Sequence, residues 1–251
     1  MALGFGVDVG GSGIKGAPVD LDRGALAQER VRLETPQPAT PDAVCDVLAQ
    51  VLEQSQAPDG PFGLTLPAVV TSGTARSAAN IDPSWIGTDV AALVRERTGR
   101  DAVVVNDADA AGLAEVRYGA ARGVQGTVLV LTLGTGIGSA LVRDGRLVPN
   151  TELGHLELDG HDAETRASDA ARKREDLSWE QWAARVQAYL RHVDALLWPD
   201  LVVLGGGVSK KTDRWLHLLD VRPELRPAEL LNDAGIVGAA LLAAEGAPAA
   251  G

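Results

Sequence analysis

The hydrophobic positions of the chain form two kinds of pattern. Short apolar runs bounded by glycines and turn residues predict strands, and these runs are 3–9, 17–22, 25–35, 63–70, 127–148 (strand, glycine loop, strand) and 201–207. Longer stretches with apolar residues three and four positions apart predict helices, and these are 40–56, 89–99, 178–199 and 232–245. Residues 101–119 begin as a strand and continue as a helix from Asn106 and Asp107. Strands that alternate with helices predict an α/β protein.

Capping residues mark the ends of several predicted helices. Thr40 precedes Pro41 at one helix start, and Gly99 follows the helix at 89–99. Ser178 and Gln181 form a capping box before the long helix that Pro199 ends. The last residues, 246–251, predict a frayed tail.

One pattern occurs twice in the chain. VDVGGSGIKGAPVD and LTLGTGIGSALVRD both contain an apolar strand, a glycine, a hydroxyl residue, a second glycine, an isoleucine and a second strand. A repeated strand–loop–strand unit predicts two similar half-structures that face each other.

The first of these loops matches a dinucleotide fingerprint only superficially. Gly11, Gly13 and Gly16 have the spacing G-x-G-x-x-G, but the fingerprint needs a helix after its glycines, and Pro18 lies in an extended segment. A P-loop needs Gly-Lys-Ser/Thr at its end, where this chain has Ile14-Lys15-Gly16. A glycine-rich hairpin remains. Its backbone N–H groups can approach phosphate oxygens closely, although tight turns alone also use glycines.

The repeat favours phosphate binding over a simple turn, and a third glycine run at 205–207 adds to it. The candidate phosphate-binding residues are Asp8, Gly10, Gly11, Ser12, Gly13, Lys15, Gly134, Thr135, Gly136, Gly206 and Lys210. Asp8 is also the candidate ligand for Mg²⁺, a hard cation that prefers oxygen ligands.

Composition limits the classes of partner. The net charge of −11 argues against a general nucleic-acid or membrane-surface binder, although a local basic strip could still serve a polyanion. The single cysteine, Cys45, allows neither an internal disulfide nor a multi-cysteine zinc site. The N-terminal residues do not read as a signal peptide, and no apolar run is long enough to span a bilayer, so we expect a cytoplasmic protein.

Two further segments carry candidate polar chemistry. Asp107 follows a strand at its carboxyl end, where open α/β sheets place ligands, and is the candidate base; alternatively, Asn106 and Asp107 only cap the next helix. The segment TELGHLELDGH (151–161) is rich in carboxylates and imidazoles. It could bind a metal, form a solvated acidic turn, or bind vicinal hydroxyls.

At these residues the chain resembles a known family. Asp8-x-Gly10-Gly11-Ser12 and Leu133–Gly138 resemble the paired phosphate motifs of the actin/hexokinase superfamily, and NDADAAGLAE and ELGHLE resemble the ROK sugar kinases. Segments 77–89, 169–183 and 204–211 are similar to the polyphosphate glucokinases of that family. Most ROK kinases carry a cysteine-rich zinc loop that this chain lacks, as those glucokinases do, so no zinc is expected.

The resemblance implies roles for particular residues. Its sugar-binding positions are Asn80, Asn106, Asp107, Glu152, His155 and Glu164, with Glu157 as the alternative to Glu164. It also implies Mg²⁺, a homodimer, and polyphosphate as the phosphate donor. Basic residues at 166, 172–174, 210, 211 and 214 could form a strip for that polyanion or a solvated surface of mixed charge. Trp179 and Trp182 could stack on an adenine, but their spacing is more typical of core packing.

These expectations combine into one hypothesis. The fold is a two-lobed ribonuclease-H-like fold with an interlobe cleft, with residues 1–107 and 232–251 in one lobe and 108–231 in the other. The activity is phosphoryl transfer from polyphosphate, or also from ATP, to the 6-hydroxyl of glucose. The alternatives are a strictly ATP-dependent glucokinase or mannokinase, an actin-type ATPase, and a sugar-sensing repressor. The repressor is disfavoured because the phosphate motif begins at Asp8, which leaves no room for a DNA-binding domain.

Overall fold

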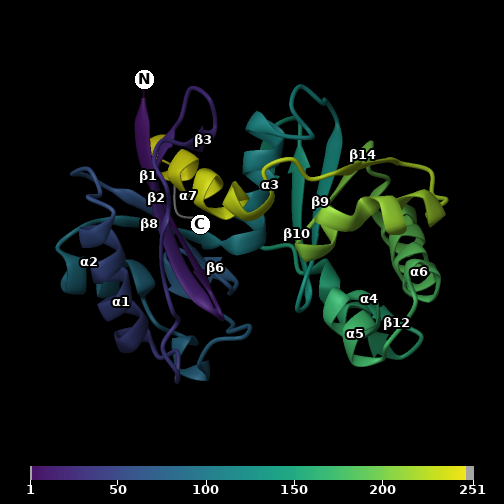
Figure 1. Cartoon of the computed structure of the whole chain (residues 1–251), viewed down its shortest axis with the longest axis horizontal. Coiled ribbons are helices and arrows are strands. Elements are labelled where there is room, and N and C mark those ends of the chain that lie inside the picture. The colour runs from purple at the N-terminus through teal and green to yellow at the C-terminus, as the bar shows by residue number, and fades with distance from the viewer. Residues whose placement is uncertain (1, 247–251) are drawn as a thin grey trace. The chain divides into compact units, whose positions relative to one another are not determined.

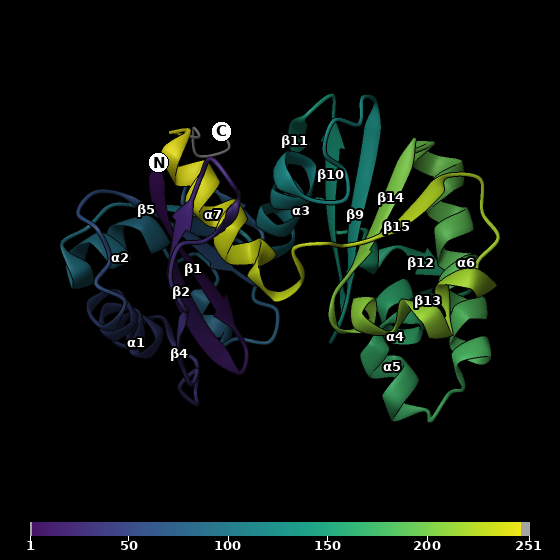
Figure 2. The same cartoon turned by 45° about the horizontal axis from the view of Figure 1, so that its top comes forward.

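The computed structural model describes residues 2–246, and it divides into two compact units. The first unit ends at Ala114 and resumes at Asp233, and the second comprises Glu115–Asn232 (Figures 1 and 2). These divisions lie a few residues from the predicted lobe boundaries at 107 and 231. Most of the predicted tail, residues 247–251, lies outside the described residues.

The first unit contains a mixed sheet in which β1 and β2 form an antiparallel hairpin and β5 and β8 run parallel to β1. The strands in spatial order are β3 (Ala25–Leu26), β2 (Gly13–Asp20), β1 (Leu3–Gly10), β5 (Phe62–Leu66) and β8 (Ala102–Asn106), with β4 (Val31–Leu33) also paired to β2. A small hairpin, β6 (Val70–Thr71) and β7 (Thr74–Ala75), and a 3₁₀ turn, η1 (Pro83–Trp85), follow β5 in the chain. The carboxyl ends of β1, β5 and β8 therefore meet at one edge of the sheet.

Helices cover both faces of this sheet (Figure 1). The helices α1 (Pro41–Gln54) and α2 (Val90–Thr98) pack together and close one apolar core, in which Phe5 and Val7 of β1 are buried. Their caps are the predicted ones, since Thr40 Oγ1 accepts the Ala43 N–H and Gly99 is left-handed with φ +69°.

Helix α7 (Ala234–Ala244) packs on β1 and β5, so the chain returns to the first unit after forming the second. The approach is close. A Cβ on Gly6 or Gly63 would lie 2.0 Å or 1.9 Å from the backbone oxygen of Ile236 or Ala239. Any side chain at those two strand positions would push α7 away from the sheet.

The second unit repeats the topology of the first. Its hairpin is β9/β10, and β14 and β15 run parallel to β9. The strands in spatial order are β11 (Arg146–Val148), β10 (Ile137–Arg143), β9 (Thr127–Leu133), β14 (Leu201–Gly205) and β15 (Glu224–Pro227). The order β10-β9-β14-β15 corresponds to β2-β1-β5-β8, so the internal sequence repeat marks two half-structures of one design.

Short helices and one long helix surround this second sheet. They are η2 (Leu153–His155), α4 (Ala163–Ala167), α5 (Asp169–Arg174), α6 (Trp179–Leu197), η3 (Gly207–Arg214) and η4 (Leu216–Leu218), with the hairpin β12 (Glu157–Leu158) and β13 (His161–Asp162) and the later turn η5 (Leu231–Asp233). Ser178 and Gln181 form the predicted capping box of α6. Trp182 is fully buried, packs edge-to-face against Trp179 and Trp215, and donates its indole N–H to Ala167 O, so it belongs to the core rather than to an adenine site.

One buried carboxylate joins the two places where the chain crosses between units. Helix α3 (Asp107–Tyr118) contains the first crossing, and residues 228–232 precede the second. Glu115 is 1% exposed, and its carboxylate accepts backbone N–H groups from Ala120 (2.9 Å), Glu229 (3.2 Å) and Leu230 (2.8 Å). The negative charge is therefore held by three donors from two separate segments.

No helix among residues 2–246 is both long and apolar enough to cross a membrane.

Replacing Glu115 with Ala should lower the free energy of unfolding by about 3 kcal/mol, because one buried and two partly buried N–H groups lose their acceptor and a cavity remains. Urea denaturation followed by circular dichroism measures the loss. Glu229→Ala is the matched control, since that side chain is exposed and its backbone N–H still donates to Glu115. Equal effects of the two substitutions would contradict the structural role of Glu115.

Candidate functional site

The first glycine loop is the tight turn between β1 and β2. Gly10 and Gly13 are cross-strand partners, so only Gly11 and Ser12 form the turn. Asn80 lies against this loop: a Cβ on Gly11 would be 3.2 Å from the Asn80 carbonyl oxygen. Asn80 itself has a left-handed backbone with φ +60°, a conformation that asparagine tolerates better than most residues. The structure therefore brings a predicted sugar-binding residue next to a predicted phosphate loop.

Asp8, on the strand that enters this loop, is held from two sides. Thr65 Oγ1 donates to one carboxylate oxygen (2.8 Å), and Lys15 Nζ donates to the other (2.9 Å). Lys15 thus forms an ion pair with Asp8. A contact of Lys15 with a phosphate stays a prediction. Thr65 carried no signal in the sequence, because its contact depends on the pairing of β1 with β5.

Asp8 fits an oxygen-preferring cation only as one ligand among several. A carboxylate has about four lone-pair sites, and two are used by Thr65 and Lys15. Within residues 2–246, no three His, Cys, Asp or Glu side chains gather into a metal cluster. Mg²⁺ at Asp8 would therefore take its other ligands from phosphate oxygens and water, which is its usual behaviour.

The turn from β8 into α3 contains Asn106 and Asp107, for which two roles were considered, helix cap and base. Asn106 is buried, and its Oδ1 accepts N–H groups from Ala108 (2.8 Å) and Asp109 (3.1 Å) while its Nδ2 donates to Ala68 O (3.0 Å). It is therefore the helix cap and also ties this turn to the segment after β5. Asp107 is half-buried, and one of its oxygens accepts the Ala108 N–H (2.8 Å). A contact of Asn106 with a sugar stays a prediction.

The second glycine loop, Gly134–Gly136, is fixed by its neighbours on both sides. Gly134 O accepts the Ala170 N–H (3.0 Å), and Glu164 Oε2 accepts the Ile137 N–H (3.0 Å) where the loop ends. A Cβ on Gly136 would lie 2.2 Å from Glu164 Oε2, so the carboxylate occupies the space that a side chain there would need. Glu164, predicted only as a sugar ligand, thus also shapes a predicted phosphate loop.

The third glycine run lies at the same sheet edge as the second loop. Gly206 has φ +83°, and a Cβ there would be 2.5 Å from Leu133 O, the last residue of β9. Helix η3 begins directly after it and carries Lys210, an exposed residue. The structure therefore brings Gly206 and the loop containing Thr135 together.

The predicted sugar residues of the second unit also converge on the end of this loop. Gly154, between Glu152 and His155, packs so tightly that a Cβ would lie 2.3 Å from Ile137 O. Ser139 of β10 strengthens the arrangement because its Oγ accepts the Leu153 N–H (3.0 Å). Ile137 is thus contacted by the segment of Glu152 and His155 and by Glu164.

Mutual electrostatic effects show that these side chains are neighbours. Partial desolvation raises the pKa of Glu152, opposed by His155 and reinforced by the negative charge of Glu164. The hydrogen bond from His155 Nδ1 to Asp162 Oδ2 (3.1 Å) is the main cause that raises the pKa of His155, with further help from Glu164. Asp162 was missed in the sequence, since only the β12/β13 hairpin brings it to His155.

The choice between Glu157 and Glu164 as third sugar ligand stays a prediction, but the geometry separates them. The negative charge of Glu164 raises the pKa of both Glu152 and His155. Glu157 is exposed and lies opposite Asp162 in the small hairpin. Glu164 is therefore the better placed of the two.

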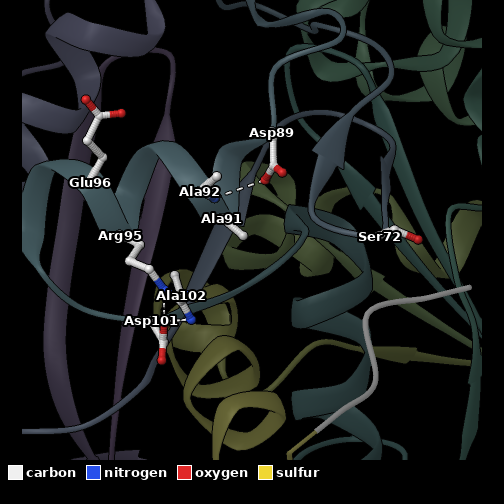
Figure 3. A pocket seen from close by; sticks show the side chains of 8 residues that line it. All are labelled: Ser72, Asp89, Ala91, Ala92, Arg95, Glu96, Asp101 and Ala102. Atoms are coloured by element: carbon white, nitrogen blue, oxygen red, sulfur yellow. Dashed lines mark hydrogen bonds and ion pairs between the residues drawn. The ribbon is translucent and has the colours of Figure 1, made fainter.

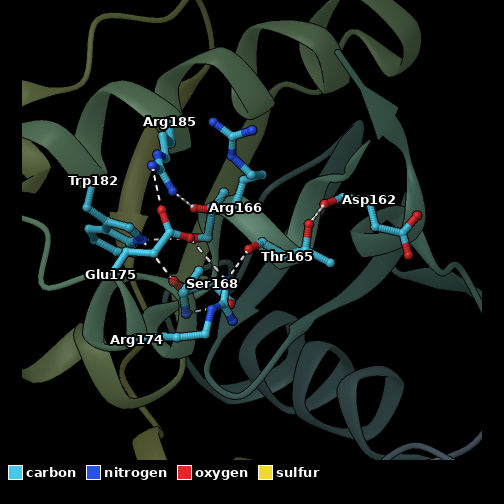
Figure 4. Close-up of polar contacts among 10 residues, drawn as sticks. Asp162, Thr165, Arg166, Ser168, Arg174, Glu175, Trp182 and Arg185 are labelled. Atoms are coloured by element: carbon cyan, nitrogen blue, oxygen red, sulfur yellow. Dashed lines mark hydrogen bonds and ion pairs between the residues drawn. The ribbon is translucent and has the colours of Figure 1, made fainter. Parts of the chain in front are cut away.

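The basic segment at 172–174 is ion-paired within the protein, although its cations outnumber the carboxylates that they contact. Arg172 and Lys173 both pair with the buried Asp169 (2.9 and 2.7 Å), and Arg172 also stacks on Trp179 at 4.2 Å. Figure 4 shows the neighbouring network, in which Glu175 pairs with Arg174 (3.1 Å) and Arg185 (2.7 Å). Four cations thus share two carboxylates, so positive charge is left in this part of the predicted strip, and its contact with a polyanion stays a prediction.

A cavity of about 540 Å³ lies beside α2 in the first unit (Figure 3). Asp89 and the ion pair of Arg95 with Asp101 are among the residues around it. Asp89 caps α2 by accepting the Ala92 N–H (2.9 Å). None of the predicted site residues lines this cavity, so it does not bear on their chemistry.

The substitution Asp162→Asn should lower the pKa of His155 toward its ordinary value of about 6.5. Because the pKa is raised in the folded protein, the stabilisation by Asp162 is present below the unfolded pKa and is lost as the pH rises through the folded one. NMR titration of the imidazole ring measures the shift. Asp159→Asn, at the turn of the same hairpin, is the control; an equal shift in both variants would exclude Asp162 as the partner.

Comparisons with known proteins identify the family. The model of the ROK family matches residues 4–173. A polyphosphate glucokinase of Mycobacterium tuberculosis (strain CDC 1551 / Oshkosh) is 51% identical over 239 residues, which cover 95% of this chain and 90% of the relative. A polyphosphate glucokinase of Mycobacterium leprae (strain TN) is 49% identical, covering 95% and 74%.

Solved structures show the same likeness. The inorganic polyphosphate/ATP-glucomannokinase from Arthrobacter sp. strain KM has a TM-score of 0.94 and 53% identity, with 98% of this chain and 100% of that chain covered. A ROK family glucokinase from Streptomyces griseus, in complex with glucose and AMPPNP, has a TM-score of 0.83 at 24% identity, covering 97% and 100%, and supports the fold alone. The resemblance and the fold class predicted from the sequence are thereby confirmed, and the chain belongs to the ROK family.

Proposed function

We propose that this protein transfers the terminal phosphate of inorganic polyphosphate to the 6-hydroxyl of glucose. The observation that carries the proposal is the likeness, over nearly the whole chain, to proteins named polyphosphate glucokinase, in a chain that retains both glycine loops. ATP is the second candidate donor, because the similar Arthrobacter enzyme is named for both donors. A strictly ATP-dependent glucokinase is the alternative.

The acceptor side of the proposal rests on hydrogen-bonding chemistry. Glucose presents vicinal hydroxyls, which donate and accept at once, and Glu152, His155 and Glu164 supply carboxylate and imidazole groups that match them. Asp162 orients the His155 ring through Nδ1, which leaves Nε2 for a hydroxyl. Asn80 and Asn106 are the proposed sugar contacts of the first unit.

Asp107 is the proposed base. Its Oδ1 accepts the Ala108 N–H, which orients the carboxylate at the start of α3. An ordinary Asp has a pKa of about 3.9, far below that of an alcohol. The mismatch is tolerable because the transition state of phosphoryl transfer is loose, so orienting the nucleophile matters more than basicity.

On the donor side, backbone N–H groups of the two glycine loops would hold phosphate oxygens. Mg²⁺, when bound beside Asp8, would neutralise charge on the transferring phosphate. Lys210, Lys211 and Arg214 of η3 have no carboxylate within ion-pair distance among residues 2–246, unlike Arg172–Arg174. These three cations of η3, directly after Gly206, therefore offer positive charge to a polyanion in the second unit.

A cytoplasmic location and a homodimeric state belong to the same proposal. The location is supported by the unpaired Cys45, which is buried and free. The homodimer is supported by the family resemblance alone. Neither nucleic acid nor a membrane surface is a proposed partner, because the net charge of −11 repels both.

A comparison of donors at saturating glucose tests the proposal. With purified protein and Mg²⁺, glucose 6-phosphate should form from polyphosphate, measured by coupled reduction of a nicotinamide cofactor. Product from ATP alone would establish the strictly ATP-dependent alternative. Hydrolysis of ATP without any sugar phosphate would instead favour the actin-type ATPase.

The substitution Asp107→Asn should reduce kcat at least about a hundredfold while the Kd for glucose changes little. The amide oxygen can still accept the Ala108 N–H, so the start of α3 should persist, but the group that takes the proton is lost. Steady-state kinetics and fluorescence titration with glucose measure the two effects. Asp101→Asn, at the start of β8, is the exposed control and should retain normal kcat. Near-normal turnover by the Asp107 variant would refute its role as base.

A further inference from the structure

A second cation lies directly on the first glycine loop, and no motif in the sequence indicated it. Arg32 belongs to β4, and its Nη2 donates to Ser12 O in the turn (2.9 Å). Its guanidinium also covers Gly13: a Cβ there would lie 2.9 Å from both Nε and Nη2 and 3.0 Å from Cζ. The group therefore contacts two of the four residues that close the hairpin.

Strand register explains how Arg32 reaches this position. Thr65, Asp8, Lys15 and Arg32 are successive cross-strand partners on β5, β1, β2 and β4. Directly opposed residues present their side chains on the same face of a sheet. The four side chains consequently form one transverse row beside the loop, with Arg32 at its outer end.

Charge balance along this row distinguishes the two cations. Lys15 and Asp8 form an ion pair at 2.9 Å and largely cancel each other. Arg32 has no carboxylate within ion-pair distance among residues 2–246, and its one recorded hydrogen bond goes to a neutral carbonyl. The surplus positive charge at the first loop is thus that of Arg32, in a chain whose net charge is −11.

The chemistry of the guanidinium matches a phosphate. Arginine has five N–H donors, of which Ser12 uses one, and its planar fork can bind two phosphate oxygens at once. Arg32 is also exposed, so a ligand can reach the remaining donors without unfolding the sheet. A lysine at the same position would supply charge but not the fork.

We propose that Arg32 binds a phosphate group of the donor at the first glycine loop. The inference rests on the proposed function in one respect, that this loop receives the donor phosphates. Arg32 supplies the positive charge there that Lys15, paired with Asp8, does not. No group is transferred to or from Arg32, which acts in binding alone.

Binding of inorganic tripolyphosphate, measured by calorimetry without glucose or turnover, tests the proposal. Arg32→Gln should weaken binding about tenfold or more, the loss typical of a charge-assisted contact. The affinity of Arg32→Lys for tripolyphosphate should lie between that of Arg32→Gln and that of the parent protein. The affinity for tripolyphosphate should also depend less steeply on salt concentration, because one ionic contact is lost and salt screens such contacts.

Two controls make the outcome decisive. Arg23→Gln removes an exposed arginine just beyond the opposite end of β2 and should leave tripolyphosphate binding unchanged. Glucose binding, followed by tryptophan fluorescence, should be the same in the parent and in the Arg32 variants, which also shows that they are folded. Unchanged tripolyphosphate affinity in Arg32→Gln, an equal loss in Arg23→Gln, or no binding by the parent protein would overturn the proposal. A parent protein that binds tripolyphosphate through Arg32 but does not phosphorylate glucose would overturn the proposed function and leave this inference standing.

Discussion

The backbone pairing of a hairpin with the strands parallel to it determines where the candidate glycine loops and the turn into α3 lie. In the first unit β1, β5 and β8 end side by side, so the loop after β1, the segment after β5 and the turn into α3 share one sheet edge. Asn106 reinforces this edge by joining α3 to Ala68. In the second unit the same pairing brings the loop after β9 next to Gly206 after β14. Polar groups that are distant in the sequence become neighbours because parallel strands point their carboxyl ends in one direction.

Much of the fold could be predicted from signals between residues that are adjacent in the sequence. Helix caps at Thr40 and Ser178 and the strand-to-helix change at Asn106 depend on a few adjacent residues, and each lies where the sequence placed it. The glycine hairpins were also local, and their repetition predicted the two related sheets. The unit boundary was less visible, because α3 continues through it without a break in pattern.

Contacts that depend on register or on a small hairpin were not predictable in the same way. Arg32, Thr65 and Asp162 carry ordinary sequence surroundings, and only strand pairing brings each one to its partner. The charge of the basic segment at 172–174 is obvious in the sequence, but its pairing with Asp169 and Glu175 is not.

Glu164 has a consequence for how this protein can be dissected. One of its oxygens fixes the exit of the second glycine loop through Ile137, and its charge acts on Glu152 and His155 at the same time. A substitution there removes a structural support and a local charge in a single step, so the two losses cannot be added as independent quantities. Under the proposed roles, kinetic defects at this position would mix acceptor and donor effects, and double-mutant cycles with neighbours such as Glu152 would separate them.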